Sequence, residues 1–178
     1  MSEIWAAWLD GALVDPTTAS VPITDRAVTV GLGCFSTLKV IRSQPFALDR
    51  YVARLQRSAR ILGIGLATPA AISEAAEACI EAGGRSEGRL RLTATAGAAG
   101  SEGVGVGSLL ATVGPLPDRS RPAELATSPY LRNEASPLAG IKSTSYAEHL
   151  LAAAHAASLG ADEALLLNSR AEVCEGTG

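Results

Sequence analysis

Aromatic residues, cysteines and long apolar runs are all scarce in this chain of 178 residues. Aromatic residues make up only 4% of the sequence although hydrophobic residues make up 47%, much of it alanine. This composition favours helices packed through small side chains over an aromatic-rich binding surface. No apolar run reaches the roughly 20 residues that a membrane-spanning helix needs, so no membrane partner is expected.

The three cysteines, Cys34, Cys79 and Cys174, are odd in number and far apart. They form no C-x-x-C pair, so the sequence favours neither a disulfide framework nor a zinc site. Unpaired cysteines, together with an N-terminus that lacks a basic leader, predict a cytoplasmic protein. The formal charge of −3, without any block of lysine and arginine, argues against a nucleic-acid partner.

Strand-like and helix-like segments alternate in the first part of the chain. Alternating apolar residues predict strands over 35–41, 89–95 and 109–113, and the Asp10-Gly11 turn predicts a hairpin over 4–14. One helix is expected to end at Leu62 with Asp49 as its N-cap. Thr68-Pro69 and Gly83-Gly84 are typical of the start and end of a second helix. The glycine-rich stretch 97–107 predicts a loop.

The proline-rich segment GPLPDRSRP predicts a linker at residues 115–122. It divides an N-terminal α/β subdomain, residues 1–114, from the start of a C-terminal subdomain, residues 123–178. We expect this second part to contain a strand over 125–128, a helix over 146–159, a strand over 164–167 and a further strand near Val173. Two groups of helices and strands indicate the α+β class.

Lys142 lies in a turn of small residues, LAGIKSTSY, at residues 138–146. A lysine is most often an exposed surface charge. An apolar niche, however, favours its neutral and nucleophilic amine. A helix and a strand follow, and then Glu175, whose carboxylate could pair with a protonated ring nitrogen. If the helix starts near Ser143, Tyr146 is expected to point toward the same pocket.

Three other patterns favour structural interpretations. Arg54, Arg57 and Arg60 recur every three residues, which favours a solvated basic stripe over an anion site. Gly31-x-Gly33 precedes a strand, so a tight bend is preferred to a Rossmann phosphate loop. His149 and His155 are six residues apart and do not share a helix face, so they are not expected to bind a metal together.

Taken together, several segments resemble the class IV pyridoxal-phosphate family of branched-chain aminotransferases, D-amino-acid aminotransferases and aminodeoxychorismate lyases. The matching segments are WLDGALV, ITDRAVTVGLGCFSTLKV, PFALDRYVARLQRSARILGI, LAGIKSTSYAEHLLAAAHAASLGADEALLLN and AEVCEGTG. The resemblance implies a two-subdomain enzyme of fold type IV that binds pyridoxal 5'-phosphate, acts on a small-molecule amine and forms a homodimer. The chain is expected to be a fragment with an incomplete second domain, since the family's remaining phosphate contacts come from segments beyond Gly178.

The resemblance also implies roles for individual residues. Lys142 would bind the cofactor aldehyde covalently and act as catalytic base and acid, and Glu175 would pair with the pyridine nitrogen. Arg54 would bind the cofactor phosphate, and Tyr146 would lie near the phenolic oxygen of the ring. Candidate substrate contacts project from the first long strand: Phe35, Thr37 and Lys39.

Departures from the family pattern guide the choice of reaction. Ser36 stands where aminotransferases usually carry the glutamate of F-E-T, and lyases resemble this chain in having a small hydroxyl there. Ala96 replaces an arginine of D-amino-acid aminotransferases, and Tyr51 replaces a common histidine. Ser36 and Ala96 are expected on the substrate side. The sequence therefore predicts a 4-amino-4-deoxychorismate lyase of folate biosynthesis, giving 4-aminobenzoate and pyruvate. A branched-chain or D-amino-acid aminotransferase and a non-catalytic relative stay as alternatives.

Overall fold

The computed structural model describes residues 3–99, 107–117 and 120–178, which fall into two compact units. The first unit comprises Met1–Leu116 and Lys142–Thr144, and the second comprises Pro117–Ile141 and Ser145–Gly178. The expected linker at 115–122 lies where the chain passes between the units. Part of that linker and most of the predicted loop at 97–107 lie outside the described residues. The unexpected feature is that three residues around Lys142 belong to the first unit.

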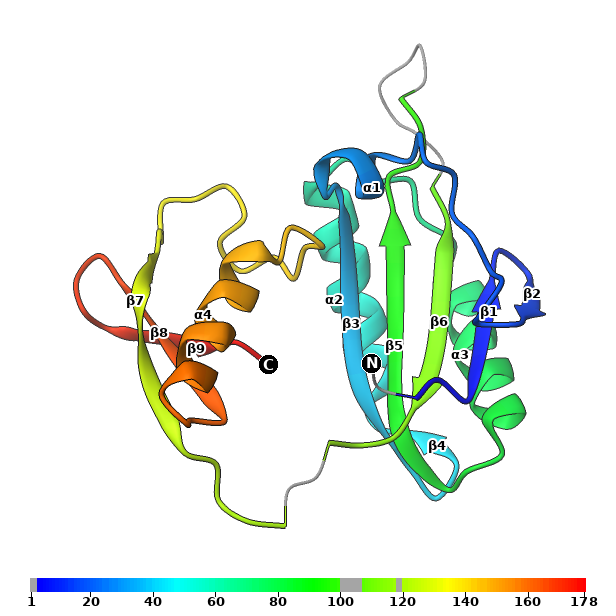
Figure 1. The fold of residues 1–178 in the computed structure, drawn as a ribbon. Coiled ribbons are helices and arrows are strands. Elements are labelled where there is room, and N and C mark those ends of the chain that lie inside the picture. Colours follow the sequence, from blue (N-terminus) through cyan, green and yellow to red (C-terminus); the bar gives the residue numbers. More distant parts are fainter. Residues whose placement is uncertain (1–2, 100–106, 118–119) are drawn as a thin grey trace. The chain divides into compact units, whose positions relative to one another are not determined.

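A six-stranded antiparallel sheet forms the centre of the first unit, in the order β2-β1-β6-β5-β3-β4 (Figure 1). The predicted hairpin is confirmed, with Asp10 and Gly11 at positive φ in its turn. The predicted long strands are confirmed as well, each within two residues of the expected bounds. The strands are β1 (Ala6–Leu9), β2 (Ala12–Val14), β3 (Gly33–Ile41), β4 (Gln44–Pro45), β5 (Glu87–Thr95) and β6 (Leu109–Gly114).

Helices α2 (Leu48–Ile61) and α3 (Pro69–Gly83) cover one face of this sheet (Figure 1). Alternation along β3 and β5 turns apolar side chains toward the helices, where they form the larger hydrophobic core of the chain. The opposite face carries polar and basic side chains. We call it the basic face, defined by five residues of β3 and β5: Phe35, Thr37, Lys39, Arg89 and Arg91.

The helix ends agree only partly with expectation. The cap of α3 is confirmed, because the Thr68 hydroxyl accepts a hydrogen bond from the backbone of Ala71, and Gly84 ends the helix at positive φ. Asp49 as the N-cap of α2 is wrong. The cap is Ala47, in a left-handed conformation without a side-chain hydrogen bond. Asp49 lies instead in the first turn, where its charge is favourable to the helix dipole.

A short helix, α1 (Arg26–Val30), was not predicted. The Asp25 carboxylate caps it by accepting from the backbone of Ala27, and Gly31 ends it at φ 69°. None of its residues is buried, so the segment has no apolar period from which a helix could be predicted.

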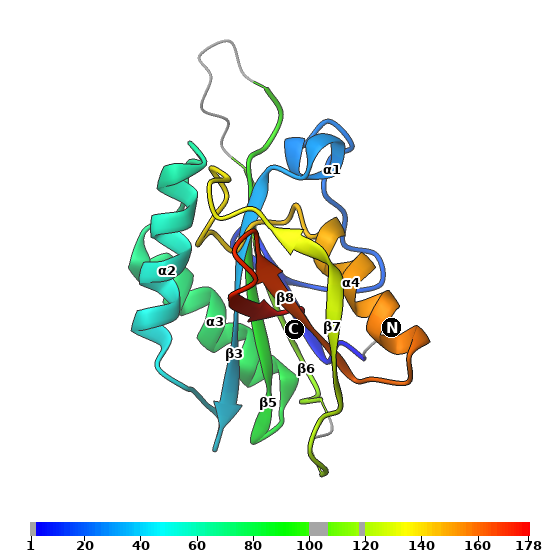
Figure 2. The ribbon, with the colours of Figure 1, turned by 90° about the vertical axis from the view of Figure 1, so that its left-hand side faces the viewer.

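The second unit is a β-α-β arrangement with one added strand (Figure 2). Strand β7 (Leu125–Arg132) pairs in parallel with β8 (Glu163–Asn168), and β9 (Val173–Gly176) pairs antiparallel with β8. Helix α4 (Ala147–Ser158) connects β7 to β8 and packs on both. Its small core contains Ala152, Ala156, Ala164 and Leu166. The α+β class is confirmed.

The helix predicted over 146–159 is confirmed within one residue at each end, and the alternative start near Ser143 does not occur. Helix α4 begins at Ala147 with Tyr146 as its N-cap, because the residues just before it are held as a strand-like segment against β3. Tyr146 therefore marks the beginning of the helix and does not lie one turn inside it.

Candidate active site

Lys142 is held by backbone pairing with the edge of β3. The amide of Phe35 donates to the carbonyl of Lys142 at 2.9 Å, and the amide of Thr144 donates to the carbonyl of Gly33 at 2.9 Å. Strand β4 pairs only with the far end of this edge, at Val40 and Ile41. The segment 142–144 thus satisfies edge groups that β4 does not reach, and the lysine is placed by the sheet itself.

A second contact fixes the same segment from its side chain. The hydroxyl of Thr144 donates to the carbonyl of Gly31 at 2.7 Å. A Cβ atom on Gly33 would lie 2.8 Å from Thr144 Oγ1 and 2.9 Å from the carbonyl oxygen of Ala94. Glycine is therefore required at position 33 so that the lysine segment can approach β3 this closely.

The bend that receives Thr144 is tied in turn to the end of β5. The buried carboxylate of Asp25 accepts from the hydroxyl of Thr95 at 2.6 Å as well as capping α1. The guanidinium of Arg26 donates to the carbonyls of Ala96 and Gly97. These contacts hold the Gly31–Gly33 bend in one position, and through it the backbone of Lys142.

The amine of Lys142 lies beside the aromatic ring of Phe35. Nζ is 5.0 Å from the ring centroid, and the guanidinium carbon of Arg91 is 3.6 Å from the same centroid. Phe35 is buried, with 4% of its surface exposed, whereas Lys142 is half-buried. The structure thus brings together Lys142 and Phe35, two of the predicted site residues, and adds Arg91, which was not predicted.

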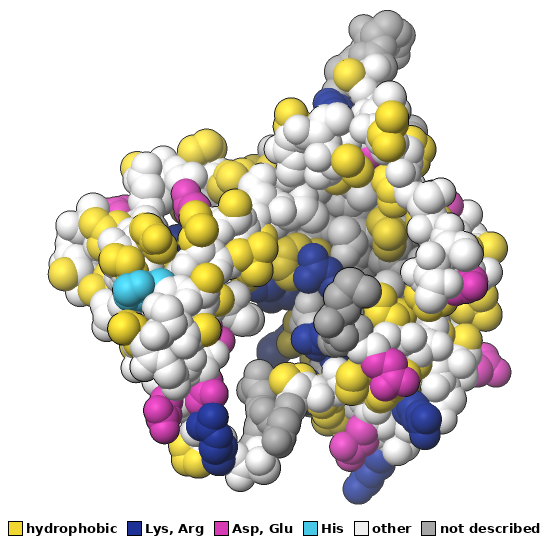
Figure 3. Space-filling view, in the orientation of Figure 1, with side chains coloured by type: hydrophobic (Ala, Val, Ile, Leu, Met, Phe, Trp, Pro, Cys, Tyr) yellow, Lys and Arg dark blue, Asp and Glu magenta, His cyan; other side chains and the backbone are white. Residues whose placement is uncertain are grey.

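The other two candidate substrate contacts also lie on the basic face. Thr37 is directly opposite Arg91 in the register of β3 and β5, and Lys39 is opposite Arg89. Lysine and arginine side chains gather over β3 beside hydrophobic ones in the space-filling view (Figure 3). Like charges directly across two strands repel each other, so this pairing is unfavourable for the sheet alone.

Ser36 and Ala96 do not lie on the basic face, and their expected place on the substrate side is wrong. Both side chains are fully buried and alternate toward the helix-covered core. The Ser36 hydroxyl donates to the carbonyl of Tyr51 at 3.1 Å and accepts from Nε of Arg54 at 3.3 Å. Ser36 therefore positions a side chain of α2.

Arg54 differs from the two arginines that share its period. Its guanidinium packs over the ring of Tyr51 at 4.9 Å from the centroid and is half-buried. Arg57 and Arg60 are less enclosed, as a solvated stripe predicts. Within the described residues the terminal nitrogens of Arg54 have no hydrogen-bond partner, which leaves them able to bind an anion.

Cys34 lies next to the lysine segment, opposite Ser143 in the bridge. Burial raises the pKa of its thiol to about 12, and burial likewise raises the pKa of Cys79 to about 11. Both thiols are protonated at neutral pH, so neither is a nucleophile.

Glu175 is surrounded by charged and aromatic side chains of the second unit. Its Oε1 accepts from Nε of Arg132 at 2.9 Å and lies 3.3 Å from Nε2 of His149. The ring of Tyr146 stacks on His149, with centroids 4.0 Å apart and planes 6° apart. The structure thus joins Tyr146 to Glu175 through His149, a link that the sequence prediction missed.

Glu172, three residues before Glu175 in the chain, makes different contacts. It is exposed and accepts from Arg170 and Asn168, and the hydrogen bond from Arg170 holds its pKa below the ordinary value. These contacts close the turn between β8 and β9. Glu172 is therefore a turn residue.

The residues that were missed left weak signals. Tyr146 and His149 are three residues apart at a helix start, a spacing that brings side chains together. Arg91 lies in an alternating strand and Arg132 ends another. The neighbours of Arg91 and Arg132 depend on the order of the strands in each sheet, which the sequence pattern does not give.

The donors present suit pyridoxal phosphate. Lys142 supplies an amine, Arg54 supplies unused guanidinium nitrogens, and Glu175 has both of its contacts on Oε1. Within the described residues Oε2 of Glu175 has no partner and is available to a protonated ring nitrogen. Lys142 belongs to the first unit, and Tyr146 and Glu175 belong to the second.

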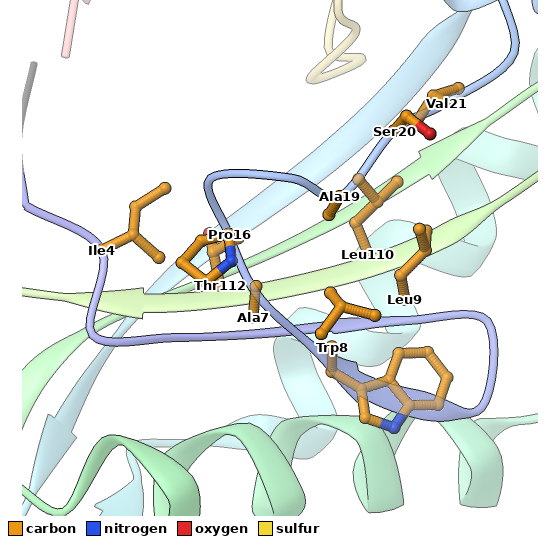
Figure 4. Close-up of a pocket in the computed structure, with 11 residues that line it drawn as sticks. Ile4, Ala7, Trp8, Leu9, Pro16, Ala19, Ser20, Val21, Leu110 and Thr112 are labelled. Carbon is orange, nitrogen blue, oxygen red and sulfur yellow. The ribbon is translucent and has the colours of Figure 1, made fainter.

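A small cavity elsewhere in the first unit contains no chemistry of this kind (Figure 4). It has a volume of about 140 Å³ and lies where the segment after β2 passes over β1 and β6. Its lining is apolar apart from Ser20 and Thr112. In the described parts of the chain there is no cluster of metal-binding side chains, and no helix there has the length and hydropathy to cross a membrane.

Comparison with solved structures shows the same fold in several enzymes. A branched-chain aminotransferase from the archaeon Thermoproteus uzoniensis, solved with norvaline, matches with a TM-score of 0.85 and 26% identity. The match covers 99% of this chain and 64% of that one. A fold IV transaminase from Curtobacterium pusillum matches with a TM-score of 0.82 and 32% identity, covering 93% of this chain and 61% of that one.

A third match is a protein of Legionella pneumophila that carries a provisional assignment as 4-amino-4-deoxychorismate lyase. It has a TM-score of 0.83 and 31% identity, covering 92% of this chain and 62% of that one. This chain therefore spans less than two thirds of the length of these relatives, consistent with an incomplete second domain.

The cofactor of the family is visible in other solved structures that match this chain. They include branched-chain aminotransferase complexes with N-(5'-phosphopyridoxyl)-L-glutamate and with pyridoxamine 5'-phosphate. The family model for amino-transferase class IV matches residues 33–178. The chain belongs to the class IV aminotransferase family, whose members depend on pyridoxal phosphate.

Proposed function

We propose that the protein is a pyridoxal-phosphate-dependent 4-amino-4-deoxychorismate lyase that releases 4-aminobenzoate and pyruvate. Lys142 is its catalytic residue. Arg54 binds the cofactor phosphate, Glu175 pairs with the ring nitrogen and Tyr146 lies near the phenolic oxygen. The homodimer and the cytoplasmic location expected from the sequence stay predictions.

The lysine and arginine side chains of the basic face are the observation that supports a lyase acting on aminodeoxychorismate. Lys39 and Arg89 face each other across two strands, and Arg91 follows beside Phe35, while Glu87 lies at the far end of the row. Repulsion within this row is relieved when an anion binds. Aminodeoxychorismate carries one carboxylate on its cyclohexadiene ring and a second on its enolpyruvyl ether group, whereas a branched-chain amino acid carries one carboxylate and an apolar side chain. A dianionic substrate therefore matches this face better.

Lys142 performs the proton transfers in this reaction. When bound, the cofactor supplies an aldehyde that captures the substrate amine and a ring that stabilises negative charge. Nζ of Lys142 takes the proton from the substrate ring carbon beside the captured nitrogen. The same atom then gives a proton to the departing enolpyruvyl group, which becomes pyruvate. Backbone bonds to β3 hold the lysine for both transfers.

Thr37, Lys39 and Arg91 bind and orient the substrate carboxylates in this proposal. Phe35 presents its ring next to the amine of Lys142 and limits access of water there. Arg54 is held by Ser36 and Tyr51 so that its terminal nitrogens are available to the phosphate.

The reaction type is tested by supplying aminodeoxychorismate to the purified protein with pyridoxal phosphate and without any keto acid. We expect equimolar pyruvate and 4-aminobenzoate, measured by a coupled dehydrogenase assay and by fluorescence. If the protein instead transfers amino groups from leucine or D-alanine to 2-oxoglutarate and releases no pyruvate from aminodeoxychorismate, the lyase proposal fails.

The substrate face is tested by comparing Arg91→Gln with Arg57→Gln, an arginine of the solvated stripe on α2. Loss of one charge-assisted contact to a carboxylate is expected to lower kcat/KM about 10- to 100-fold in Arg91→Gln. Arg57→Gln is expected to stay within about twofold of wild type. Equal kcat/KM values for the two variants would contradict the role of the basic face.

An aminotransferase is the second candidate, supported by the similarity of this chain to the branched-chain aminotransferase of Thermoproteus uzoniensis and the fold IV transaminase of Curtobacterium pusillum. A non-catalytic relative is the third. Cofactor colour separates it from both enzymes. We expect a yellow protein in which borohydride fixes the cofactor on Lys142, detected by peptide mass spectrometry. We also expect Lys142→Ala to remain colourless after dialysis.

A further inference from the structure

His149 is a buried polar residue in the first turn of α4. Only 5% of its surface is exposed, and its ring stacks almost parallel to that of Tyr146, three residues before it. Histidine in an alanine-rich helix is replaceable by an apolar residue unless its nitrogens are used. The question is therefore what the two ring nitrogens do.

Nε2 lies 3.3 Å from Oε1 of Glu175. An ionised carboxylate only accepts hydrogen bonds, so the proton of this bond belongs to Nε2. Nδ1 is buried and has no hydrogen-bond partner within the described residues. A second proton on Nδ1 would be a buried donor without an acceptor, which is costly. The surroundings therefore select the neutral ring with its proton on Nε2.

Other charged groups near this pair come from three elements. Arg132 of β7 donates from Nε to Oε1 of Glu175 and from Nη1 to Glu148 of α4, at 2.9 Å and 2.7 Å. The Tyr146 hydroxyl donates to the carbonyl of Thr177 at 3.3 Å, and the amide of Thr177 donates to Glu163 of β8. Arg132 shares its one positive charge between Glu175 and Glu148, so the assignment of a neutral His149 ring rests on Nδ1, which has no acceptor among the described residues. The contribution of His149 is directional.

We infer that His149 is a positioning residue that holds the carboxylate of Glu175 and the ring of Tyr146 in a single arrangement. Its Nε2–H directs Oε1, which leaves Oε2 as the atom available to a bound ring nitrogen. Its ring face holds Tyr146 by stacking. This inference rests on the proposed function, in which Glu175 and Tyr146 contact the same cofactor. His149 itself touches neither cofactor nor substrate.

The first test is the protonation state of His149 in the cofactor-free protein. Long-range nitrogen–proton correlation spectra of the ¹⁵N-labelled protein distinguish the two neutral tautomers and the charged ring. We expect the His149 ring to show the Nε2–H tautomer at pH 7, with His149→Gln used to assign its signals. A ring protonated on Nδ1 would overturn the inference, whatever the enzyme activity is.

The second test compares two substitutions that separate the ring from its donor. His149→Phe keeps an aromatic ring against Tyr146 but has no donor, whereas His149→Gln has an N–H donor and no ring. His155→Phe, six residues later on the same helix, is the control. The dissociation constant of pyridoxal phosphate is measured by equilibrium dialysis, together with the pH titration of the bound cofactor's absorbance.

We expect His149→Phe to raise the cofactor dissociation constant about tenfold and to shift the absorbance titration. His149→Gln should recover most of both effects, and His155→Phe should change neither. Equal constants and titrations for His149→Phe and His155→Phe would overturn the inference. Thermal melting confirms that each variant is folded, and the tautomer test decides the matter if His149→Phe is not.

These readouts separate the inference from the proposed reaction. A protein that binds pyridoxal phosphate but releases no pyruvate from aminodeoxychorismate would overturn the lyase proposal. The effect of His149 on cofactor binding would still be measured in that protein, because none of these readouts depends on turnover.

Discussion

The two units hold their candidate site residues by different means. In the first unit, Lys142 is fixed by backbone hydrogen bonds to β3, behind which lies a core of some twenty buried side chains. In the second unit, Glu175 is fixed by side-chain contacts with Arg132 and His149, and the core cluster contains Ala152, Ala156, Ala164 and Leu166.

This difference matters for chemistry. A backbone-paired lysine keeps its position when salt or pH changes, because amide hydrogen bonds carry no net charge. A carboxylate held by an arginine with 21% of its side chain exposed responds to both. The backbone of the proposed catalytic lysine is therefore held by uncharged contacts, and the carboxylate proposed to pair with the cofactor ring is held by contacts that solution conditions can alter.

The largest expected effect is on the small core. Leu92 and Leu166 are both almost fully buried. Changing either one to alanine is expected to lower the free energy of unfolding of the protein by about 2–5 kcal/mol. Among the described residues, Leu166 is the only large side chain in its buried cluster. Hydrogen exchange measured by mass spectrometry should therefore rise throughout β7, β8 and α4 in Leu166→Ala, and throughout the six-stranded sheet in Leu92→Ala.

Leu150→Ala is the matched control for this pair, because Leu150 lies on α4 with 66% of its surface exposed. Its unfolding free energy is expected to change by about 0.5 kcal/mol or less. Uniform acceleration of exchange over both units in Leu166→Ala would show that they unfold together, and the contrast between the two cores would then lose its meaning.

A smaller effect is expected for the contacts that hold the backbone of residues 142–144 against β3. Thr144→Val keeps the side-chain shape but removes the hydrogen bond to the carbonyl of Gly31, at a cost of about 1 kcal/mol. Thr144→Ser keeps the hydroxyl and serves as control. We expect kcat to fall several-fold in Thr144→Val and cofactor affinity to stay near wild type. Equal kcat values in the two variants would mean that backbone pairing alone places the lysine.

The long elements of the fold were predictable because each has a periodic signal. The hairpin, β3, β5, β6 and both long helices follow from turn residues, alternation and caps. Helix α1 and the two-residue strand β4 are too short to have a period, and the cap at Ala47 depends on a left-handed backbone that alanine does not signal.

The sequence predicted the candidate site residues whose own functional group suggests a role, and it did not predict the contacts that position them. Lys142 and Glu175 were singled out by their local sequence, and the family resemblance supplied their roles, which stay predictions. The pairing of 142–144 with β3 depends on an edge that β4 leaves unpaired, which no local pattern encodes. His149 could not be placed because its partner Glu175 lies 26 residues away, on strand β9. Ser36 was misplaced because the strand face toward the helices depends on the packing of α2.

The smallest expected effect concerns the turn that leads into β9. Hydrogen bonds from the hydroxyl and amide of Ser169, with help from Arg170, lower the pKa of Glu134 to about 2 from its ordinary value of 4.5. The folded state therefore binds this proton less readily than the unfolded state does. The stabilisation from Glu134 is present above pH 4.5 and is lost as pH falls toward 2.

Glu134→Gln should accordingly make the stability of the second unit less dependent on pH between about 4.5 and 2, as followed by local hydrogen exchange at several pH values. Some slope will remain, because the lowered pKa of Glu172 acts in the same direction in the same turn. Glu74→Gln, an exposed change on α3, should leave the slope unaltered. If Glu134→Gln left the pH dependence of the stability of the second unit unchanged, the side-chain contacts of this turn would not contribute measurably to that stability. Dependence on charge would then be confined to the cluster around Glu175.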